Sequence, residues 1–186
     1  MVTIGVTGHR FLADVDRLTE GIDEALRQIE VAFPGRPLTV ISPLAEGADR
    51  LVARRALARH GTRLIVPLPL PQTNYMADFA TKRSRAEFLA LLRLADETIV
   101  LSPAETREAA YEAVGRFILD RCDVLLAVWD GKAARGRGGT GEIVALARAR
   151  GLPMAWVHIG NRKPGDQEIT APGTEQGAVS FERFPR

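Results

Sequence analysis

A glycine-rich stretch at residues 136–142 contains the residue types that most directly suggest chemistry. It reads Gly-Arg-Gly-Gly-Thr-Gly-Glu, follows an apolar run at 124–129 and precedes apolar residues at helical spacing. A glycine loop between a strand and a helix presents backbone N–H groups at the positive end of a helix dipole, where phosphate binds without a special side chain. We therefore predict a phosphate-binding loop for a nucleotide-like ligand. The residues expected to contact the ligand are Gly138, Gly139, Thr140 and Gly141.

Glu142 ends this stretch and lies in the first turn of the expected helix. Its carboxylate either complements the helix N-terminus or faces the ligand. The loop is not a Walker A motif, because no Lys-Ser or Lys-Thr pair follows the glycines, and it is not the GxGxxG fingerprint of dinucleotide-binding proteins. The stretch therefore predicts a phosphate site without specifying the nucleotide.

A second candidate loop reads Thr-Gly-His-Arg at residues 7–10, directly after an apolar segment. Gly8 would let the backbone approach a ligand, His9 adds a titratable ring, and Arg10 has the fork geometry that pairs with phosphate. The alternative is a plain tight turn with an exposed arginine.

A third candidate loop reads Ser-Pro-Leu-Ala-Glu-Gly-Ala-Asp at residues 42–49. Glu46 could accept hydrogen bonds from a ribose hydroxyl, while Gly47 and Ala48 would present N–H groups to phosphate. Asp49 suits the start of the following helix, so helix capping alone could explain it.

The fourth loop begins with Trp129, Asp130 and Gly131. The indole could stack on a base, and Asp130 could bond a ribose or hold the glycine loop. Alternatively, Trp129 belongs to the core and Asp130 starts an Asx turn.

The apolar patterns of the chain predict an alternation of strands and helices. Strands are expected at 2–6, 38–41, 63–66, 98–101, 124–129 and 153–159. This alternation predicts a Rossmann-like three-layer α/β/α sandwich with a mainly parallel sheet of about six strands. Alternate prolines at 67–71 predict an extended loop, because proline is excluded from the interior of a sheet.

In such sheets, ligands bind beyond the carboxyl ends of the strands, near the point where the strand order reverses. The candidate loops follow strands one, two and five, so we expect them to meet at that edge and surround one nucleotide pocket. The proline-containing loop after strand three should open on the same edge.

Length and composition describe an ordinary globular chain of 186 residues, with 46% hydrophobic and 26% charged residues. We predict one domain over residues 1–160. Residues 161–186 form a C-terminal extension that we expect to be partly irregular and loosely attached, because it offers little apolar surface to bury. Phe181 and Phe184 could tether its end.

Charge and cysteine content exclude several classes of protein. The formal net charge is +2 and no basic block is present, so a nucleic-acid partner is not expected. The single cysteine, Cys122, excludes an internal disulfide and a cysteine-rich zinc site. We predict neither a metal site nor a cofactor.

No apolar run reaches the length of a membrane span, and no secretory signal is visible. We therefore expect a cytoplasmic protein without a membrane partner.

Together, these loops resemble the SLOG superfamily of Rossmann-like domains over roughly residues 1–160. This group includes the Lonely Guy phosphoribohydrolases, the YpsA-like proteins and the DNA-processing protein DprA. The loop at 42–49 is similar to the Ser-Gly-Leu-Ala-Arg-Gly-Ile-Asp loop of DprA, with Glu46 in the place of its arginine. The loop at 136–142 is similar to the Pro-Gly-Gly-x-Gly-Thr-x-x-Glu loop of the Lonely Guy enzymes.

The resemblance implies a nucleotide-binding sensor or regulatory domain that forms a homodimer. Its enzymatic alternative is a nucleoside 5′-monophosphate phosphoribohydrolase, in which Glu142 would act on the glycosidic bond and Arg116 or Arg10 would anchor the phosphate. The enzymes place their glutamate three positions after the threonine, where this chain has Ile143, and they carry an Arg-Lys pair for which Arg116 is the nearest counterpart. These departures favour binding over catalysis. Single-stranded DNA binding, as in DprA, is a third and less favoured possibility.

Overall fold

The computed structural model describes residues 1–133, 138–160 and 175–185. Within these residues, the strands are β1 (Val2–Gly8), β2 (Leu38–Ile41), β3 (Arg63–Leu68), β4 (Glu97–Val100), β5 (Val124–Trp129), β6 (Met154–His158) and β7 (Val179–Glu182). The helices are α1 (Val15–Ala32), α2 (Ala48–Leu57), α3 (Gln72–Met76), α4 (Lys82–Leu92), α5 (Arg107–Leu119) and α6 (Thr140–Ala149).

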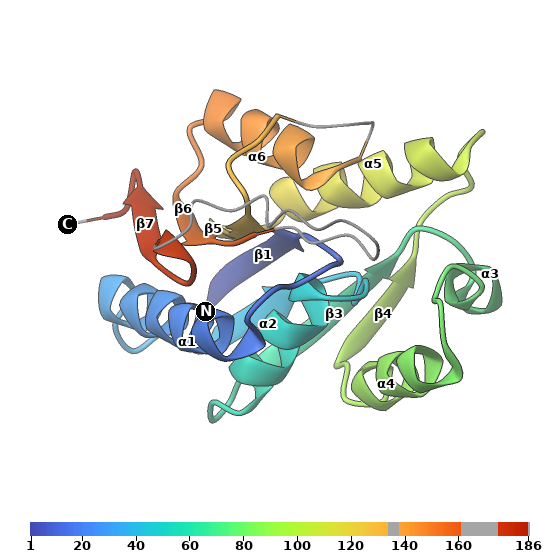
Figure 1. Cartoon of the computed structure of the whole chain (residues 1–186), viewed down its shortest axis with the longest axis horizontal. Helices are drawn as coiled ribbons and strands as arrows, with labels where there is room; N and C mark the ends of the chain where they lie inside the picture. Colours follow the sequence, from blue (N-terminus) through green and yellow to red (C-terminus); the bar gives the residue numbers. More distant parts are fainter. Residues whose placement is uncertain (134–137, 161–174, 186) are drawn as a thin grey trace.

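The strands form one seven-stranded sheet in the order β4-β3-β2-β1-β5-β6-β7 (Figure 1). Strands β1 to β6 pair in parallel, and β7 pairs antiparallel with β6. The chain moves outward from β1 to β4 and then crosses back to place β5 on the other side of β1. The strand order therefore reverses between β1 and β5, as in doubly wound Rossmann-like sheets.

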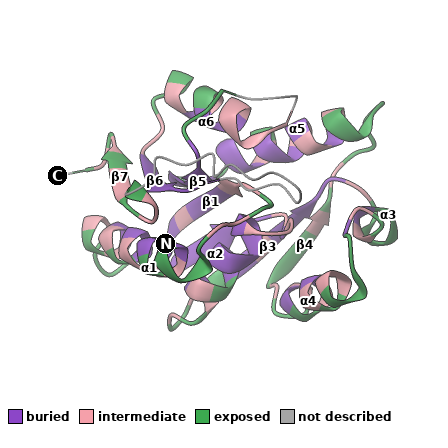
Figure 2. Cartoon of the chain, in the orientation of Figure 1, coloured by how far each residue is buried: buried purple, intermediate pink, exposed green. Residues whose placement is uncertain are grey.

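Helices cover both faces of the sheet, which gives the predicted three layers (Figure 1). Side chains of α1, α2 and α4 pack with Ile4 and Val40 in one core cluster. Side chains of α5 and α6 pack with Leu125 and Ala127 in a second cluster. Because successive residues of a strand point to opposite faces, the central strands are buried on both sides (Figure 2). The predicted Rossmann-like α/β fold is confirmed.

The proline-rich segment corrects one boundary. Pro67, which we expected in a loop, lies inside β3, and its register partner is Ile99 of β4. The β2 strand ends at Ile41 opposite Ile65, so no β2 residue is paired opposite Pro67. Proline is compatible with a strand where no ladder bond from its nitrogen is needed.

The region after β3 forms two separate helices. Helix α3 ends at Met76, and α4 starts at Lys82 behind Thr81, whose hydroxyl accepts a hydrogen bond from the Ser84 N–H at 3.0 Å. A threonine N-cap of this kind marks a helix start. The basic run that begins with Lys82 therefore opens a new helix.

The end of the chain supplies the seventh strand, which we did not predict. Strand β7 pairs with β6 from Val157↔Val179 to Met154↔Glu182. Next to it, the rings of Phe181 and Phe184 meet edge to face at 4.8 Å. This part of the C-terminal extension is thus joined to the sheet. Among the described residues, no helix is long and apolar enough to cross a membrane.

Candidate functional site

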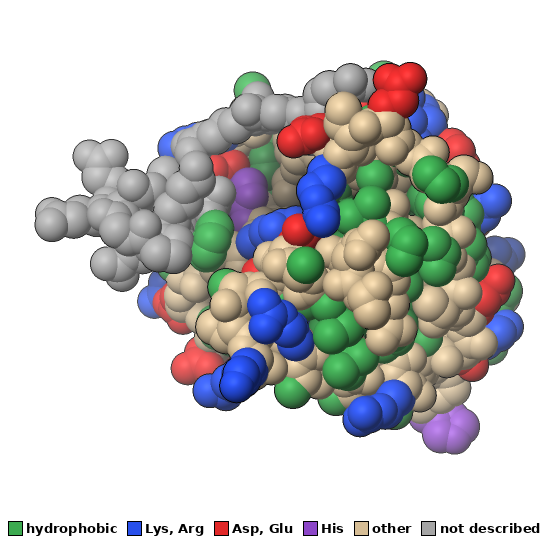
Figure 3. Space-filling view, turned by 90° about the vertical axis from the view of Figure 1, so that its right-hand side faces the viewer, with side chains coloured by type: hydrophobic (Ala, Val, Ile, Leu, Met, Phe, Trp, Pro, Cys, Tyr) green, Lys and Arg blue, Asp and Glu red, His purple; other side chains and the backbone are tan. Residues whose placement is uncertain are grey.

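A cavity of about 410 Å³ lies at the carboxyl edge of the sheet, where the strand order reverses. It is bounded by the loop after β1, the loop between β2 and α2, the loop after β5 and the start of α6, with α3 and α5 closing its sides. Its volume lies within the range of small-molecule sites. Figure 3 shows the edge of the molecule on which basic and acidic side chains and a histidine gather around a hollow.

Nine of the predicted ligand-binding residues line this cavity. They are Gly8, His9, Arg10, Trp129, Asp130, Gly138, Gly139, Thr140 and Gly141. Within the described part of the chain, the cavity is not lined by the predicted residues Glu46, Gly47, Ala48, Gly131, Glu142 and Arg116. Gly136 and Arg137 of the predicted phosphate loop lie outside the described residues.

His9 and Asp130 join the two loops that flank the reversal point. His9 Nε2 lies 3.2 Å from the Asp130 backbone nitrogen and 3.0 Å from Asp130 Oδ1. The imidazole accepts from the N–H when Nε2 is bare and donates to the carboxylate when Nε2 carries a proton. Asp130 Oδ1 also accepts a hydrogen bond from the Lys132 N–H at 3.1 Å. This bond forms the Asx turn that the sequence suggested as the alternative role of Asp130.

Arg10 follows His9 in the same loop and contacts α5. Its guanidinium stacks over the ring of Tyr111 at 5.4 Å and remains exposed. Tyr111 is itself held by its hydroxyl, which donates to the Asp78 carboxylate. No described carboxylate lies within ion-pair distance of Arg10. Its guanidinium is hydrogen-bonded to Tyr111, and its remaining N–H donors can bind an anionic ligand.

Gly8 and Gly47 bring the first two loops into direct backbone contact. A Cβ at Gly47 would lie 2.2 Å from the Arg10 carbonyl oxygen, and one at Gly8 would lie 2.4 Å from the Ala48 Cβ. Gly47 also has a φ of 85°, and the Ala48 N–H donates to the His9 carbonyl at 3.0 Å. Gly47 and Ala48 therefore contact the loop after β1 and do not line the cavity themselves.

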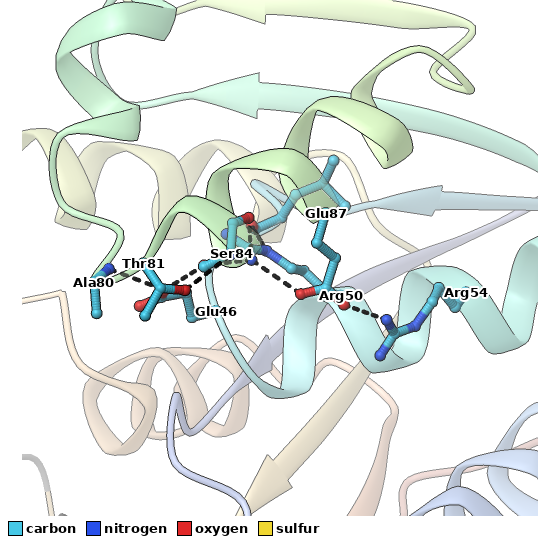
Figure 4. Close-up of polar contacts among 8 residues, drawn as sticks. Glu46, Arg50, Arg54, Ala80, Thr81, Ser84 and Glu87 are labelled. Carbon is cyan, nitrogen blue, oxygen red and sulfur yellow. Dashed lines mark hydrogen bonds and ion pairs between the residues drawn. The ribbon is translucent and has the colours of Figure 1, made fainter.

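Glu46 binds helix α4 rather than facing the cavity (Figure 4). Its Oε1 accepts a hydrogen bond from the Ala80 N–H at 3.2 Å and another from the Ser84 hydroxyl. A carboxylate is favoured beside the first turn of a helix. Glu46 thus fastens the β2–α2 loop to α4.

Buried Arg50 reinforces this connection (Figure 4). It donates to the Leu44 carbonyl at 2.9 Å, to the Ser84 carbonyl at 2.9 Å and to Glu87 at 3.2 Å. Its guanidinium also lies 4.5 Å from the centroid of the Phe79 ring. Burying a charge requires such partners, and here they fix the loop that carries the cavity residues Pro43, Ala45 and Asp49.

The start of α6 provides the N–H groups expected of a phosphate site. Gly139 is the N-cap and has no side chain to occupy the first turn. No described residue accepts a hydrogen bond from the N–H of Thr140 or Gly141. The Gly138 N–H, by contrast, is bound to Glu142 Oε2 at 2.6 Å. Glu142 therefore binds the Gly138 backbone. The N–H groups that we expect to bind a ligand are those of Thr140 and Gly141 in the first turn of α6.

Gly138 is required by its contact with α5. It has a φ of 72°, and a Cβ there would lie 2.8 Å from the Glu112 backbone nitrogen. Glu112 pairs with Arg116, whose Nη2 lies 2.8 Å from Glu112 Oε1. Neither Arg116 nor Glu142 lines the cavity, so the pair expected for glycosidic cleavage is not placed in it.

Trp129 is a buried side chain that shows only part of its surface to the cavity. Its indole N–H donates to the Lys132 carbonyl at 2.9 Å, and its ring lies 5.1 Å from that of Trp156. The Trp156 indole donates to the Trp129 carbonyl at 2.9 Å. These contacts favour the core interpretation of Trp129 over a base-stacking platform.

The cavity residues that the sequence-based prediction missed include Asp49, Tyr75 and Tyr111. For Asp49, helix capping was a sufficient alternative explanation, and the residue was not included among the predicted ligand contacts. Tyr75 is spaced four residues from Phe79, as core residues of a helix are, and it does pack edge to face against the Phe79 ring at 5.0 Å. Only their position beside the cavity distinguishes these residues from ordinary core and cap residues.

Asp49 has the most strongly perturbed carboxyl group of the cavity. Burial raises its pKa from 3.8 to about 7, against the opposing effects of hydrogen bonds from the Ala45 backbone and the Ser42 side chain and of the charges of Arg10 and Arg50. Perturbed carboxyl groups in cavities are frequent in functional sites. No group of three or more potential metal-ligating side chains occurs among the described residues.

No protein-family model and no curated protein matches this sequence. Among solved structures, the crystal structure of TM1055, a structural genomics target, is similar at 18% sequence identity and a TM-score of 0.48. The match covers 83% of this chain and 72% of that chain. The class is therefore defined by the topology itself, which is that of a Rossmann-like α/β protein with a cavity at its reversal point.

Substitution of Gly47 tests the backbone contact behind the cavity. We expect Gly47→Ala to lower the free energy of unfolding by about 2–5 kcal/mol, because the methyl group meets the Arg10 carbonyl and φ is positive. Gly61→Ala is the matched control, with a φ of 76° but nothing within 4 Å, and should cost only about 1 kcal/mol. Urea denaturation measures both values. Equal losses would contradict the packing role of Gly47.

The raised pKa of Asp49 predicts a stability difference that depends on pH. Between about pH 4 and pH 7, the folded protein keeps a proton on Asp49 that the unfolded chain releases, so this group makes the folded state less stable as the pH rises. Asp49→Asn removes that titration. Its stability relative to the parent should increase from pH 4 to pH 8 by up to about 4 kcal/mol, measured by denaturation across that range. A difference independent of pH would contradict the assignment.

Proposed function

We propose that this chain binds a phosphorylated nucleoside or related sugar phosphate in the cavity at the reversal point, as a SLOG-type binding domain. The observation that carries the proposal is the pair of N–H groups of Thr140 and Gly141 at the start of α6, from which no described residue accepts a hydrogen bond, in a cavity that Arg10 also lines. Backbone donors at a helix N-terminus and a guanidinium are the two features that phosphate uses most often in proteins.

The rest of the cavity supports a small organic phosphate over inorganic phosphate alone. Its volume of about 410 Å³ leaves room beyond the phosphate. The walls combine apolar side chains such as Val114 and Ile143 with polar groups on several sides. Ligand sites of this type use an apolar lining and a few polar groups that fix orientation.

Binding is favoured over hydrolysis by the positions of the two candidate catalytic side chains. Glu142 accepts a hydrogen bond from the Gly138 N–H, and Arg116 is paired with Glu112. Neither lines the cavity, whereas a general acid or base must reach the proton that it transfers. A sensor or regulatory role therefore fits the cavity better than that of a phosphoribohydrolase.

A thermal-shift and calorimetric panel of nucleoside 5′-monophosphates, with the unphosphorylated nucleosides as references, tests this function. Binding to the native state raises stability, so at least one monophosphate should stabilise the chain while its nucleoside does not. A panel without any stabilisation would overturn the proposal.

Arg10→Gln gives the matching variant. The substitution removes the positive charge that Arg10 contributes to the cavity. It should weaken the binding of the stabilising monophosphate about 10- to 100-fold. Arg121→Gln is the control, because Arg121 is likewise exposed and stacks on an aromatic ring, that of Phe117 at 3.7 Å, but does not line the cavity. Equal affinities of the two variants would place the phosphate elsewhere.

A further inference from the structure

Tyr75 places an unused hydroxyl group in the wall of the cavity. The side chain is fully buried, and its Oη has no hydrogen-bond partner among the described residues. Its ring is fixed by edge-to-face contacts with Phe79 at 5.0 Å and with Phe88 at 5.7 Å. A buried hydroxyl without a partner is costly to the folded state, so its presence beside a cavity indicates that a ligand supplies the missing hydrogen bond.

Asp49 lines the same cavity, and its charge acts on the Tyr75 hydroxyl. Burial and the charge of Asp49 raise the pKa of Tyr75, while the charges of Arg10 and Arg50 oppose this effect. Asp49 also lines the cavity and is 4% exposed. Tyr75 of α3 and Asp49 at the start of α2 are therefore two buried polar side chains that line the same cavity.

The charges around this wall decide which kind of group it can accept. Above about pH 7, where it is ionised, the carboxyl group of Asp49 disfavours an anion, and the guanidinium groups of Arg10 and Arg50 disfavour a cation. A neutral group that both donates and accepts remains. A sugar hydroxyl meets this requirement, because it can donate to the Asp49 carboxylate and accept from the Tyr75 hydroxyl.

We propose that Tyr75 and Asp49 form a hydroxyl-binding subsite that takes the vicinal diol of a ribose whose phosphate is held at the start of α6. This assignment rests on the proposed function and specifies its ligand as a ribose phosphate rather than a deoxyribose phosphate. Asp49 thereby takes the role that the sequence suggested for Glu46 in the same loop. Because the wall is shielded from water, loss of one hydroxyl leaves a buried group unpaired and lowers affinity.

Calorimetric titration with ribose 5-phosphate, 2-deoxyribose 5-phosphate and inorganic phosphate tests the subsite. The parent protein should bind ribose 5-phosphate about tenfold more tightly than the deoxy sugar. Tyr75→Phe keeps the aromatic ring and should reduce that ratio to about twofold or less by weakening only the ribose compound. Its melting temperature should stay equal or rise, because an unpartnered hydroxyl is removed.

Tyr111→Phe is the matched control, since its hydroxyl is already bound to Asp78, and it should keep the tenfold ratio. Equal affinity of the parent for the two sugar phosphates would overturn the subsite while leaving the phosphate site standing. An unchanged ratio in Tyr75→Phe would also overturn it. If neither sugar phosphate nor inorganic phosphate binds the parent, the proposed function itself fails together with the subsite.

Discussion

The close packing of the β1 loop on the β2–α2 loop is the constraint on which the site depends. Gly8 and Gly47 permit it, because any Cβ at either position would collide with the opposite loop. On the other side, His9 connects the β1 loop to Asp130 after β5. The loop at 7–10 is therefore held from both sides at the reversal of strand order, and the position of Arg10 follows from that placement.

The sequence predicted the architecture well because the strands are short, apolar and separated by clear helical patterns. The strands β2 and β5 begin and end at the residues expected. Pro67 was excluded from β3 by a general rule on proline that applies only where the nitrogen faces a partner strand. β7 was missed because its apolar-polar alternation covers only four residues beside a polar segment, which is too short to predict a strand with certainty.

The site could be predicted only in part, because sequence shows which loops meet but not which side chains turn inward. The rule for parallel sheets brought the loops of Gly8, Asp130 and Gly139 to one edge. It could not show that Glu46 turns toward α4 while Asp49 lines the cavity, since both belong to the same loop. Tyr75 has the spacing of a core residue and also packs as one, so only the structure shows its unused hydroxyl.

The most direct test of the central claim is a nitrogen-15 NMR titration of the full chain with ribose 5-phosphate. The phosphate should perturb the backbone N–H resonances of Thr140 and Gly141 most strongly, because these donors lie at the positive end of α6 and no described residue accepts from them. The Gly138 N–H, which is already bound to Glu142, should shift less. Shifts concentrated away from the start of α6, or no shifts at millimolar ligand, would contradict the account.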